Sequence, residues 1–324
     1  MRTHIAYPSF LRKRHGIVLK LFAASAIAAA GAVTVQSVWS APQEEQAPKG
    51  GDIPKTFTPL MVGRDYDKRE VMIPMRDGVK LHTVIVVPTA ARNAPILLTR
   101  TPYDASKRAN RTDSPYMLAT LPQGDEVFVA AGYIRVFQDV RGKYKSEGDY
   151  VMTRPVRGPL NAAKTDHVTD AYDTIDWLVK NLPESNGRVG MIGSSYEGFT
   201  VVMALLGPHP ALKVAAPESP MVDGWMGDDW FHYGAFRQIN IDYFSEQTSE
   251  KGAGSAVARE AYDDYDVFRN AGSAGNYVRA HGLDELPFAQ RLMEHPAYDS
   301  FWQGQALDKL VAEHPSQIPT MWIQ

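Results

Sequence analysis

Residues 188–200 read RVGMIGSSYEGFT, and this stretch decides how the rest of the chain is interpreted. An apolar run at 189–192 leads into Gly193-Ser194-Ser195-Tyr196-Glu197-Gly198, and an apolar pattern with helical spacing follows over 199–206. A strand that turns sharply into a helix at a glycine-flanked serine is a nucleophile elbow, which lifts the serine Oγ clear of the sheet. The segment therefore predicts Ser195 as a catalytic nucleophile.

One position departs from the usual elbow pattern. Gly193 stands two residues before Ser195, but Glu197 occupies the second position after it and Gly198 the third. A G-x-S-x-x-G string is common and by itself is more often structural than catalytic. Its place between a predicted strand and a predicted helix, after several alternating strands and helices, favours the catalytic interpretation.

The sequence around the elbow predicts an α/β fold. Two β-branched runs, 71–73 and 81–87, flank Arg76-Asp77-Gly78, which is a strong signal for a hairpin of antiparallel strands. Farther along, short apolar runs alternate with a helical pattern over 171–182, and this alternation implies a parallel sheet with crossover helices. The later predicted strands are 96–98, 133–137, 189–192, 212–216 and a last one, PTMWIQ, at 319–324.

Residues 223–317 are predicted to form a helical cap inserted between two strands of the sheet. This stretch is rich in aromatic residues and paired acids, as in DGWMGDDWFHYGAFRQ, has helical spacing and holds no convincing strand. Its aromatic residues could line an acyl pocket for aromatic side chains, although core packing is the better interpretation for most of them. The residues concerned are Trp225, Trp230, Phe231, Tyr233 and Phe236.

The N-terminus has the pattern of an export signal. A basic stretch through Lys20 precedes a 15-residue apolar run at 21–35, and small residues precede Ala41. Residues 1–40 are therefore predicted to be a cleaved signal peptide, and 41–58, rich in Pro and Gly, a flexible leader. An uncleaved anchor is the alternative, but the run is shorter than the ~20 residues that a spanning helix needs. We expect a mature protein that is periplasmic or secreted, with no membrane segment.

Composition excludes several classes of function. The 324 residues are 44% hydrophobic and 22% charged, as in an ordinary globular protein. The net charge is −3, and because residues 1–40 hold five bases and no acid, the remainder carries −8, which disfavours a nucleic-acid partner. No cysteine is present to form disulfides or thiolate sites. No phosphate loop, H-E-x-x-H or EF-hand pattern appears, so we expect no cofactor and no metal.

A serine nucleophile needs a histidine base and an acid that orients the histidine. In an α/β-hydrolase fold both follow the serine, and neither is evident after Ser195 because no candidate histidine follows a convincing strand. We therefore expect residues 59–324 to be an incomplete α/β-hydrolase domain, truncated before the last sheet strands, whose acid and histidine lie beyond Gln324. The histidines set aside as surface or cap residues are His209, His232, His281, His295 and His314.

Four segments in order resemble a family of serine hydrolases that includes cocaine esterase and X-Pro dipeptidyl peptidase. They are 100–103 (RTPY), 139–142 (DVRG), 193–198 (GSSYEG) and 227–234 (GDDWFHYG). The last segment most resembles the α-amino acid ester hydrolases of that family. The resemblance runs from about residue 60 to Gln324, the first half or so of such an enzyme. Of the second segment, Arg141-Gly142 is interpreted as a structural turn.

The resemblance also suggests how an oxyanion is bound. The backbone N–H of Tyr196 is one donor by the elbow geometry itself. A tyrosine hydroxyl after an early strand is the second donor in the family, and Tyr103 occupies the matching position. Spacing alone favours a different interpretation of Tyr103, as a tyrosine packed beside Pro102.

Asp229 is the third residue that the resemblance singles out. It matches a member of the acidic cluster with which α-amino acid ester hydrolases bind the substrate's ammonium group. A carboxylate shielded from water selects a cationic substrate strongly. Asp228 is adjacent and easily confused with it, and the alternative is that both acids belong to a solvated face or a helix N-terminal turn. The family also implies a homotetramer.

The function expected is a serine hydrolase that releases α-amino acyl groups from small esters or amides, β-lactam-type amides included, through a Ser195 acyl-enzyme. The acyl group then passes to water or to an amine. An X-Pro dipeptidyl peptidase or a general carboxylesterase of the same family is the alternative among enzymes. A non-catalytic binding protein is the alternative if the chain is complete at Gln324, and a chain ending there is expected to be inactive.

Overall fold

The computed structural model describes residues 51–52, 56, 63–227 and 229–324. The predicted signal peptide and nearly all of the predicted leader lie outside the described residues, as does Asp228. Residues 60–324 form one structural unit, to which everything below refers. No helix among the described residues is long and apolar enough to cross a membrane.

The fold opens with the predicted hairpin. Strands β1 (Tyr66–Pro74) and β2 (Lys80–Pro88) pair antiparallel, with Met72 opposite His82. The turn between them holds Asp77-Gly78, as the sequence predicts.

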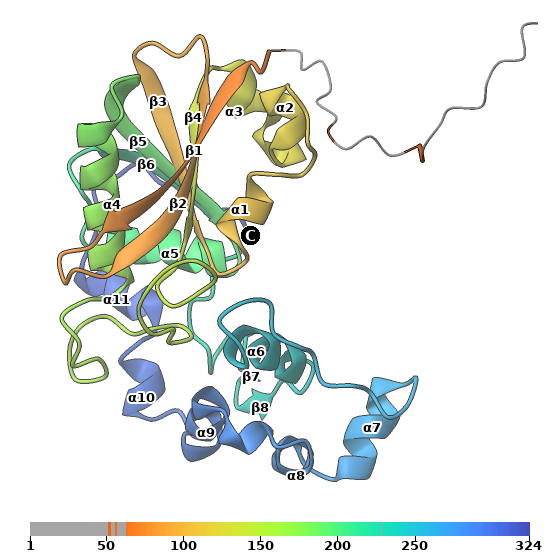
Figure 1. The fold of residues 1–324 in the computed structure, drawn as a ribbon. Coiled ribbons are helices and arrows are strands. Elements are labelled where there is room, and N and C mark those ends of the chain that lie inside the picture. Colours follow the sequence, from red (N-terminus) through yellow and green to blue (C-terminus); the bar gives the residue numbers. More distant parts are fainter. Residues whose placement is uncertain (1–50, 53–55, 57–62, 228) are drawn as a thin grey trace, which may run out of the picture. The chain divides into compact units, whose positions relative to one another are not determined.

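Six strands build the central sheet, in the order β1-β2-β4-β3-β5-β6. β1 to β2 and β2 to β4 pair antiparallel, and all later pairs are parallel. The chain is therefore an α/β protein, and the carboxyl ends of β3, β4, β5 and β6 share one edge of the sheet (Figure 1). The remaining strands are β3 (Ala94–Thr101), β4 (Ile134–Asp139), β5 (Ser185–Ser194) and β6 (Leu212–Glu218).

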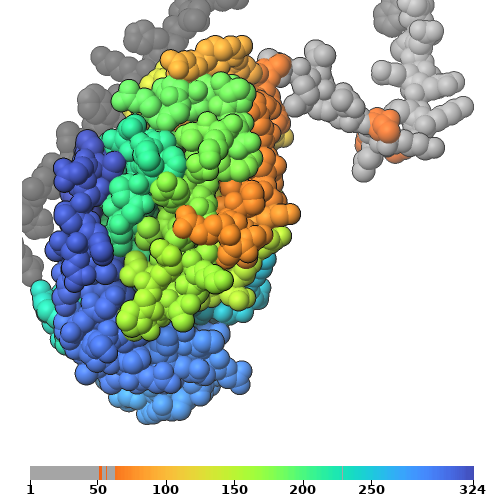
Figure 2. Space-filling model, turned by 90° about the vertical axis from the view of Figure 1, so that its left-hand side faces the viewer, coloured from red at the N-terminus to blue at the C-terminus, as the bar shows by residue number. Residues whose placement is uncertain are grey.

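Helices cover both faces of the sheet because β2 is apolar on both. Val84 and Val86 face one cluster of buried side chains, with α1 (Ala105–Arg108) and α2 (Met117–Thr120). Ile85 and Val87 face the other, with α4 (His167–Asn181) and α5 (Tyr196–Leu205). A short helix η1 (Gln123–Asp125) and α3 (Glu126–Ala130) complete the first side. Figure 2 views the α4 side, with the N-terminal strands in orange and the C-terminal residues in blue.

The predicted cap is mostly helical and lies beyond the carboxyl edge of the sheet (Figure 1). The expectation that it holds no strand is wrong at one place: β7 (Phe231–His232) and β8 (Ala235–Phe236) form a hairpin. Its two-residue turn, Tyr233-Gly234, has φ 48° and 87°, which is the conformation of the tightest hairpins. The cap helices are α6 (Asn240–Thr248), α7 (Asp264–Ala271), α8 (Ala274–Ala280), η2 (Leu283–Glu285), α9 (Pro287–Glu294), α10 (Ser300–Gln303) and α11 (Leu307–Glu313).

The predicted last strand lies beside β6. Thr320 and Ile323 form isolated parallel bridges with Ala215 and Glu218. The backbone N–H of Met321 donates to the Ala215 carbonyl at 3.0 Å, and that of Ile323 donates to the Pro217 carbonyl at 3.1 Å. Residues 319–324 thus extend the parallel part of the sheet past β6.

Candidate active site

Ser195 stands alone between β5, which ends at Ser194, and α5, which begins at Tyr196. Its backbone has φ 58° and ψ −121°, a conformation that costs a non-glycine residue about 1–3 kcal/mol. Its N–H donates to the Glu218 carbonyl at 2.9 Å, and its carbonyl accepts from the Phe199 N–H at 2.9 Å. These bonds hold the strained turn, and Ser195 is exposed at the carboxyl edge of the sheet.

Two glycines allow the turn because atoms of other residues approach them closely. A Cβ on Gly193 would lie 2.5 Å from the Cβ of Glu197. A Cβ on Gly198 would lie 2.7 Å from the Glu218 carbonyl oxygen and 3.0 Å from that of Gly193. The close contact with β6 therefore falls at the third residue after the nucleophile, which explains why glycine stands there and Glu197 one position earlier.

Glu197 itself anchors the elbow to α1. Its carboxylate is buried and accepts from Arg108 Nε at 2.9 Å, with a second, shorter contact from Arg108 Nη2. Arg108 is 37% exposed, so one end of this ion pair faces solvent. The pair joins the helix that follows the nucleophile to the segment that carries Tyr103.

Tyr103 lies in the loop between β3 and α1, and its hydroxyl reaches the nucleophile. The hydroxyl hydrogen-bonds with the Tyr243 hydroxyl at 2.9 Å and lies close enough to Ser195 to interact with its side chain. Burial raises the pKa of Tyr103, and the interactions with Tyr243 and Ser195 act in the opposite direction. Tyr103 is therefore a neutral O–H group at neutral pH near Ser195, and its role as an oxyanion donor stays a prediction.

Tyr196 follows Ser195 directly and is the first residue of α5. As the first residue of α5, its N–H has no acceptor within the helix and lies next to Ser195. Its side chain is buried, which raises its pKa to about 12, and its hydroxyl accepts from the Thr153 N–H at 3.3 Å. The ring packs edge-on against His167, whose pKa is lowered well below its usual value by burial and nearby arginines.

Asp229 lies in the cap, just before β7. The side chain of Asn240 donates to its backbone carbonyl, which ties it to the start of α6. Its charge helps to raise the pKa of Tyr243, after burial and the contact of Tyr243 with Tyr103. The structure thus brings Asp229 within electrostatic reach of the tyrosine pair at Ser195. Asp228 is outside the described residues, so the two acids are not compared.

Most of the five histidines after Ser195 make contacts with other side chains or with the backbone. His209 is buried and lies outside the cap, contrary to the expectation of a surface or cap residue. Its Nδ1 accepts from the Ala211 N–H at 3.0 Å, and its ring packs against Tyr172. His232 belongs to β7, and His314 follows α11. Three of the histidines lie beside a carboxylate, with N···O distances of 3.5 Å for His209–Asp176, 3.4 Å for His281–Glu260 and 2.7 Å for His295–Asp299. The base for Ser195 remains a prediction.

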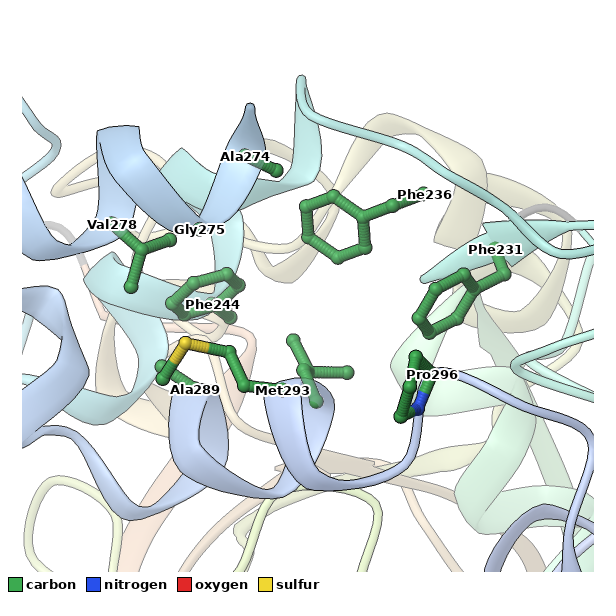
Figure 3. Close-up of a pocket in the computed structure, with 10 residues that line it drawn as sticks. Phe231, Phe236, Phe244, Ala274, Gly275, Val278, Ala289, Met293 and Pro296 are labelled. Carbon is green, nitrogen blue, oxygen red and sulfur yellow. The ribbon is translucent and has the colours of Figure 1, made fainter. Parts of the chain in front are cut away.

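The cap also holds a small apolar pocket of about 190 Å³. Phe231 and Phe236 of the β-hairpin face it, together with Phe244 of α6, Val278 of α8 and Met293 of α9 (Figure 3). Trp230 is buried and stacks on Tyr243, whereas Tyr233 is 68% exposed. The cap aromatics therefore divide between core packing, this pocket and the surface.

Two residues near the candidate site, Tyr243 and Lys143, are not predicted by the sequence analysis. Tyr243 is 140 residues from Tyr103, and no local pattern marks their contact. Lys143 is 1% exposed, and its ammonium donates to the carbonyls of Gln247, Glu250 and Gly252 at 2.9–3.0 Å. It therefore fastens the C-terminal end of α6, the helix of Tyr243, to the loop after β4. Burial lowers the pKa of Lys143 to about 8.

Other predictions for this region concern Arg141 and metals. Arg141 follows β4 and pairs with Asp170 at 2.6 Å and Asp77 at 2.9 Å, which agrees with its interpretation as part of a structural turn. Among the residues that the structure describes, no group of three or more His, Cys, Asp or Glu side chains could hold a metal ion.

An α/β sheet with a strained, exposed serine at the junction of β5 and α5 is the arrangement of a serine hydrolase. The model of the family X-Pro dipeptidyl-peptidase (S15 family) matches residues 77–324, and the chain belongs to this family. It is also similar to cocaine esterase of Rhodococcus sp. (strain MB1 Bresler), at 30% identity over 263 residues, which are 76% of this chain and 42% of that protein.

Two solved structures are similar as well. An α-amino acid ester hydrolase matches with a TM-score of 0.81 and 67% identity, over 86% of this chain and 45% of that one. An aminopeptidase from the marine sediment archaeon Thaumarchaeota archaeon matches with a TM-score of 0.79 and 52% identity, over 84% and 45%. These findings confirm the family resemblance read from the motifs. The chain spans less than half the length of these relatives.

Proposed function

We propose that this chain carries the nucleophile of a hydrolase that releases α-amino acyl groups from esters or amides. The observation that supports this most is the exposed Ser195, held in a strained turn with the Tyr103 hydroxyl beside it. The 67% identity with an α-amino acid ester hydrolase supports the choice of substrate class.

In the proposed reaction, Ser195 Oγ attacks the carbonyl carbon and passes its proton to a histidine base. The tetrahedral oxyanion is bound by the Tyr196 backbone N–H and the Tyr103 O–H. Collapse breaks the bond to the leaving group, which takes the proton back from the base, and water or an amine then removes the acyl group from Ser195. The histidine and its acid lie outside residues 1–324 in this proposal.

Asp229 supplies the selectivity for α-amino acyl groups in this proposal. A cationic ammonium two bonds from the reacting carbonyl would gain from a carboxylate in a partly buried cap more than from one in water. Asp229 is half-buried and close enough to Tyr243 to influence its pKa. Amides of β-lactam nuclei with α-amino acyl side chains fall within the same class of substrate.

Further parts of the proposal follow from the sequence pattern and the family. Residues 1–40 would direct export, so that the mature protein acts in the periplasm or outside the cell on small molecules, without a nucleic-acid or membrane partner. The protein would assemble as a homotetramer. Sedimentation of the protein from its host, together with N-terminal sequencing, tests both points.

The test of the substrate class compares phenylalanine methyl ester with its N-acetyl derivative. The two share the scissile ester, and only the first carries an ammonium group. We expect kcat/KM to be at least tenfold higher for the free amine, since a charge-assisted contact is worth about 1.5–3 kcal/mol. Equal rates would make the protein a general esterase, and preference for an Xaa-Pro anilide would make it an X-Pro dipeptidyl peptidase.

A further inference from the structure

A surface lined by cations borders Tyr103 on the side of α1, in contrast to the acidic Asp229 of the cap. It is an open groove of about 580 Å³ lined by Tyr103, Lys107, Arg108, Asn110, Arg111 and Pro122. Tyr103 is thus shared between the cap, where it meets Tyr243, and this groove. α1 flanks the sheet while the cap helices lie beyond its carboxyl edge (Figure 1).

The groove keeps an excess of positive charge. Of its three cations, Arg108 is matched by a carboxylate, that of Glu197. The guanidinium of Arg111 donates to the backbone carbonyls of Leu118 and Ala119, both at 3.2 Å, and these acceptors are neutral.

Lys107 extends from the exposed side of α1. The nearest acid in sequence, Asp104, caps the same helix through the N–H groups of Ser106 and Lys107 at 3.0 and 3.2 Å. Two cations, Lys107 and Arg111, therefore face the groove without a carboxylate that matches them, among the interactions that the structure describes.

We infer that this groove binds the leaving group of the substrate and prefers a leaving group with a free carboxylate, such as an amino acid or a hydroxy acid. The inference rests on the proposed function. Asp229 belongs to the cap and Lys107 to α1, and Tyr103 contacts the cap and lines the groove. In this proposal the ammonium of the acyl group points toward the cap and the leaving group toward the groove. The negative charge of such a leaving group meets Lys107 and Arg111.

The chemistry of the step is the same for a charged or a neutral leaving group. The Ser195 Oγ–carbonyl bond forms, the bond from the carbonyl carbon to the leaving oxygen or nitrogen breaks, and the leaving group takes the proton from the base. Only the binding of the departing fragment differs. Binding at exposed cations is worth about 0.2–1 kcal/mol per pair, so we expect a several-fold effect on KM, weakened by salt.

The experiment uses the complete gene product and two esters of phenylalanine, one with glycolic acid and one with glycolamide. They have the same scissile bond and differ only in the terminal carboxylate. We expect a KM about three- to tenfold lower for the glycolate ester at low salt, and a smaller difference at high salt. The Lys107→Gln variant should lose a factor of about two to five of that preference.

The control variant is Lys213→Gln, which removes another exposed lysine, from β6. It should keep the full preference for the glycolate ester. Arg111→Gln should reduce the preference further when it is combined with Lys107→Gln. Lys107→Gln alone decides whether the subsite exists, because Arg111 also hydrogen-bonds the backbone carbonyls of Leu118 and Ala119.

The outcomes separate this inference from the proposed function. Hydrolysis of both esters with equal KM, or an equal effect of Lys107→Gln on both, overturns the carboxylate subsite and leaves the function standing. Failure of the wild-type protein to hydrolyse either ester overturns the proposed function, and the subsite with it.

Discussion

The hydroxyl of Tyr103, after β3, lies 2.9 Å from the hydroxyl of Tyr243, on cap helix α6. Tyr103 also interacts with the Ser195 side chain, so a residue of the cap contacts the tyrosine beside the nucleophile. When Tyr243 donates to Tyr103, the proton of Tyr103 is free to point at an oxyanion on the acyl carbon.

Tyr103→Phe should lower kcat on an amino acid ester by about 10²–10³-fold, as expected for loss of one oxyanion donor, with a small change in KM. Tyr243→Phe should lower kcat less, because Tyr103 keeps its own hydroxyl. Steady-state kinetics measure both, and Tyr265→Phe, which alters a tyrosine that is 68% exposed, is the matched control. An unchanged kcat in Tyr103→Phe would show that Tyr103 does not bind the oxyanion.

Asp229→Asn should raise KM for phenylalanine methyl ester by about tenfold or more, since an ammonium loses its carboxylate partner. KM for a phenylacetate ester, which has no amino group, should stay the same. Asp308→Asn, a surface acid on α11, serves as the control for removing one charge. Equal loss on both esters would count against ammonium binding by Asp229.

Gly198→Ala should destabilise the fold by about 1–3 kcal/mol and lower kcat, because the new Cβ meets backbone atoms of Glu218 and Gly193 that cannot move aside easily. Gly124→Ala is the control, since no atom lies within 4 Å of a Cβ there. Urea unfolding compares the two variants. If both unfold at the same urea concentration, the contact with β6 does not constrain the elbow.

Lys143 should make stability depend on pH. Its pKa is lowered by burial from 10.5 to about 8, with Glu250 and Asp139 acting in the opposite direction and the rings of Tyr144 and Tyr150 beside the ammonium. Between these pH values the unfolded chain holds a proton that the folded one has released. The free energy of unfolding therefore rises with pH across this window, by up to about 3 kcal/mol from this group.

The measurement is urea unfolding of the wild type and Lys143→Met at pH 7 to 10. The difference between their free energies of unfolding separates the effect of Lys143 from that of the buried tyrosines. The raised pKa values of those tyrosines lower the free energy of unfolding as the pH rises above 10. The free energy of unfolding of the wild type should increase relative to that of the variant as the pH rises past 8. Curves that run parallel would show that Lys143 titrates at its ordinary pKa.

The sequence predicts the elements that depend on local periodicity. The hairpin of β1 and β2, the parallel strands and the elbow at Ser195 all follow from alternation and from glycine positions. The hairpin of β7 and β8 does not, because two residues per strand are too few for a period, and only the Tyr233-Gly234 turn hints at it.

Contacts across the fold leave no such signal. No sequence pattern near Tyr243 indicates its contact with Tyr103. That contact depends on where the cap places α6. Lys143 looks in sequence like a solvated lysine after a turn, but the fold buries it and pairs its ammonium with three carbonyls of residues 247–252. The glycine at position 198 is likewise explained by the neighbouring strand β6 and not by the elbow alone.

The most direct test of the account is whether Ser195 is an activated nucleophile. The protein purified from its natural host is treated with a fluorophosphonate, and its intact mass and labelled peptide are measured, with Ser195→Ala as the control. We predict a mass increase of one phosphonyl group, located on Ser195 and absent from the variant. No increase in the wild type, or a label on Ser194, would contradict the account.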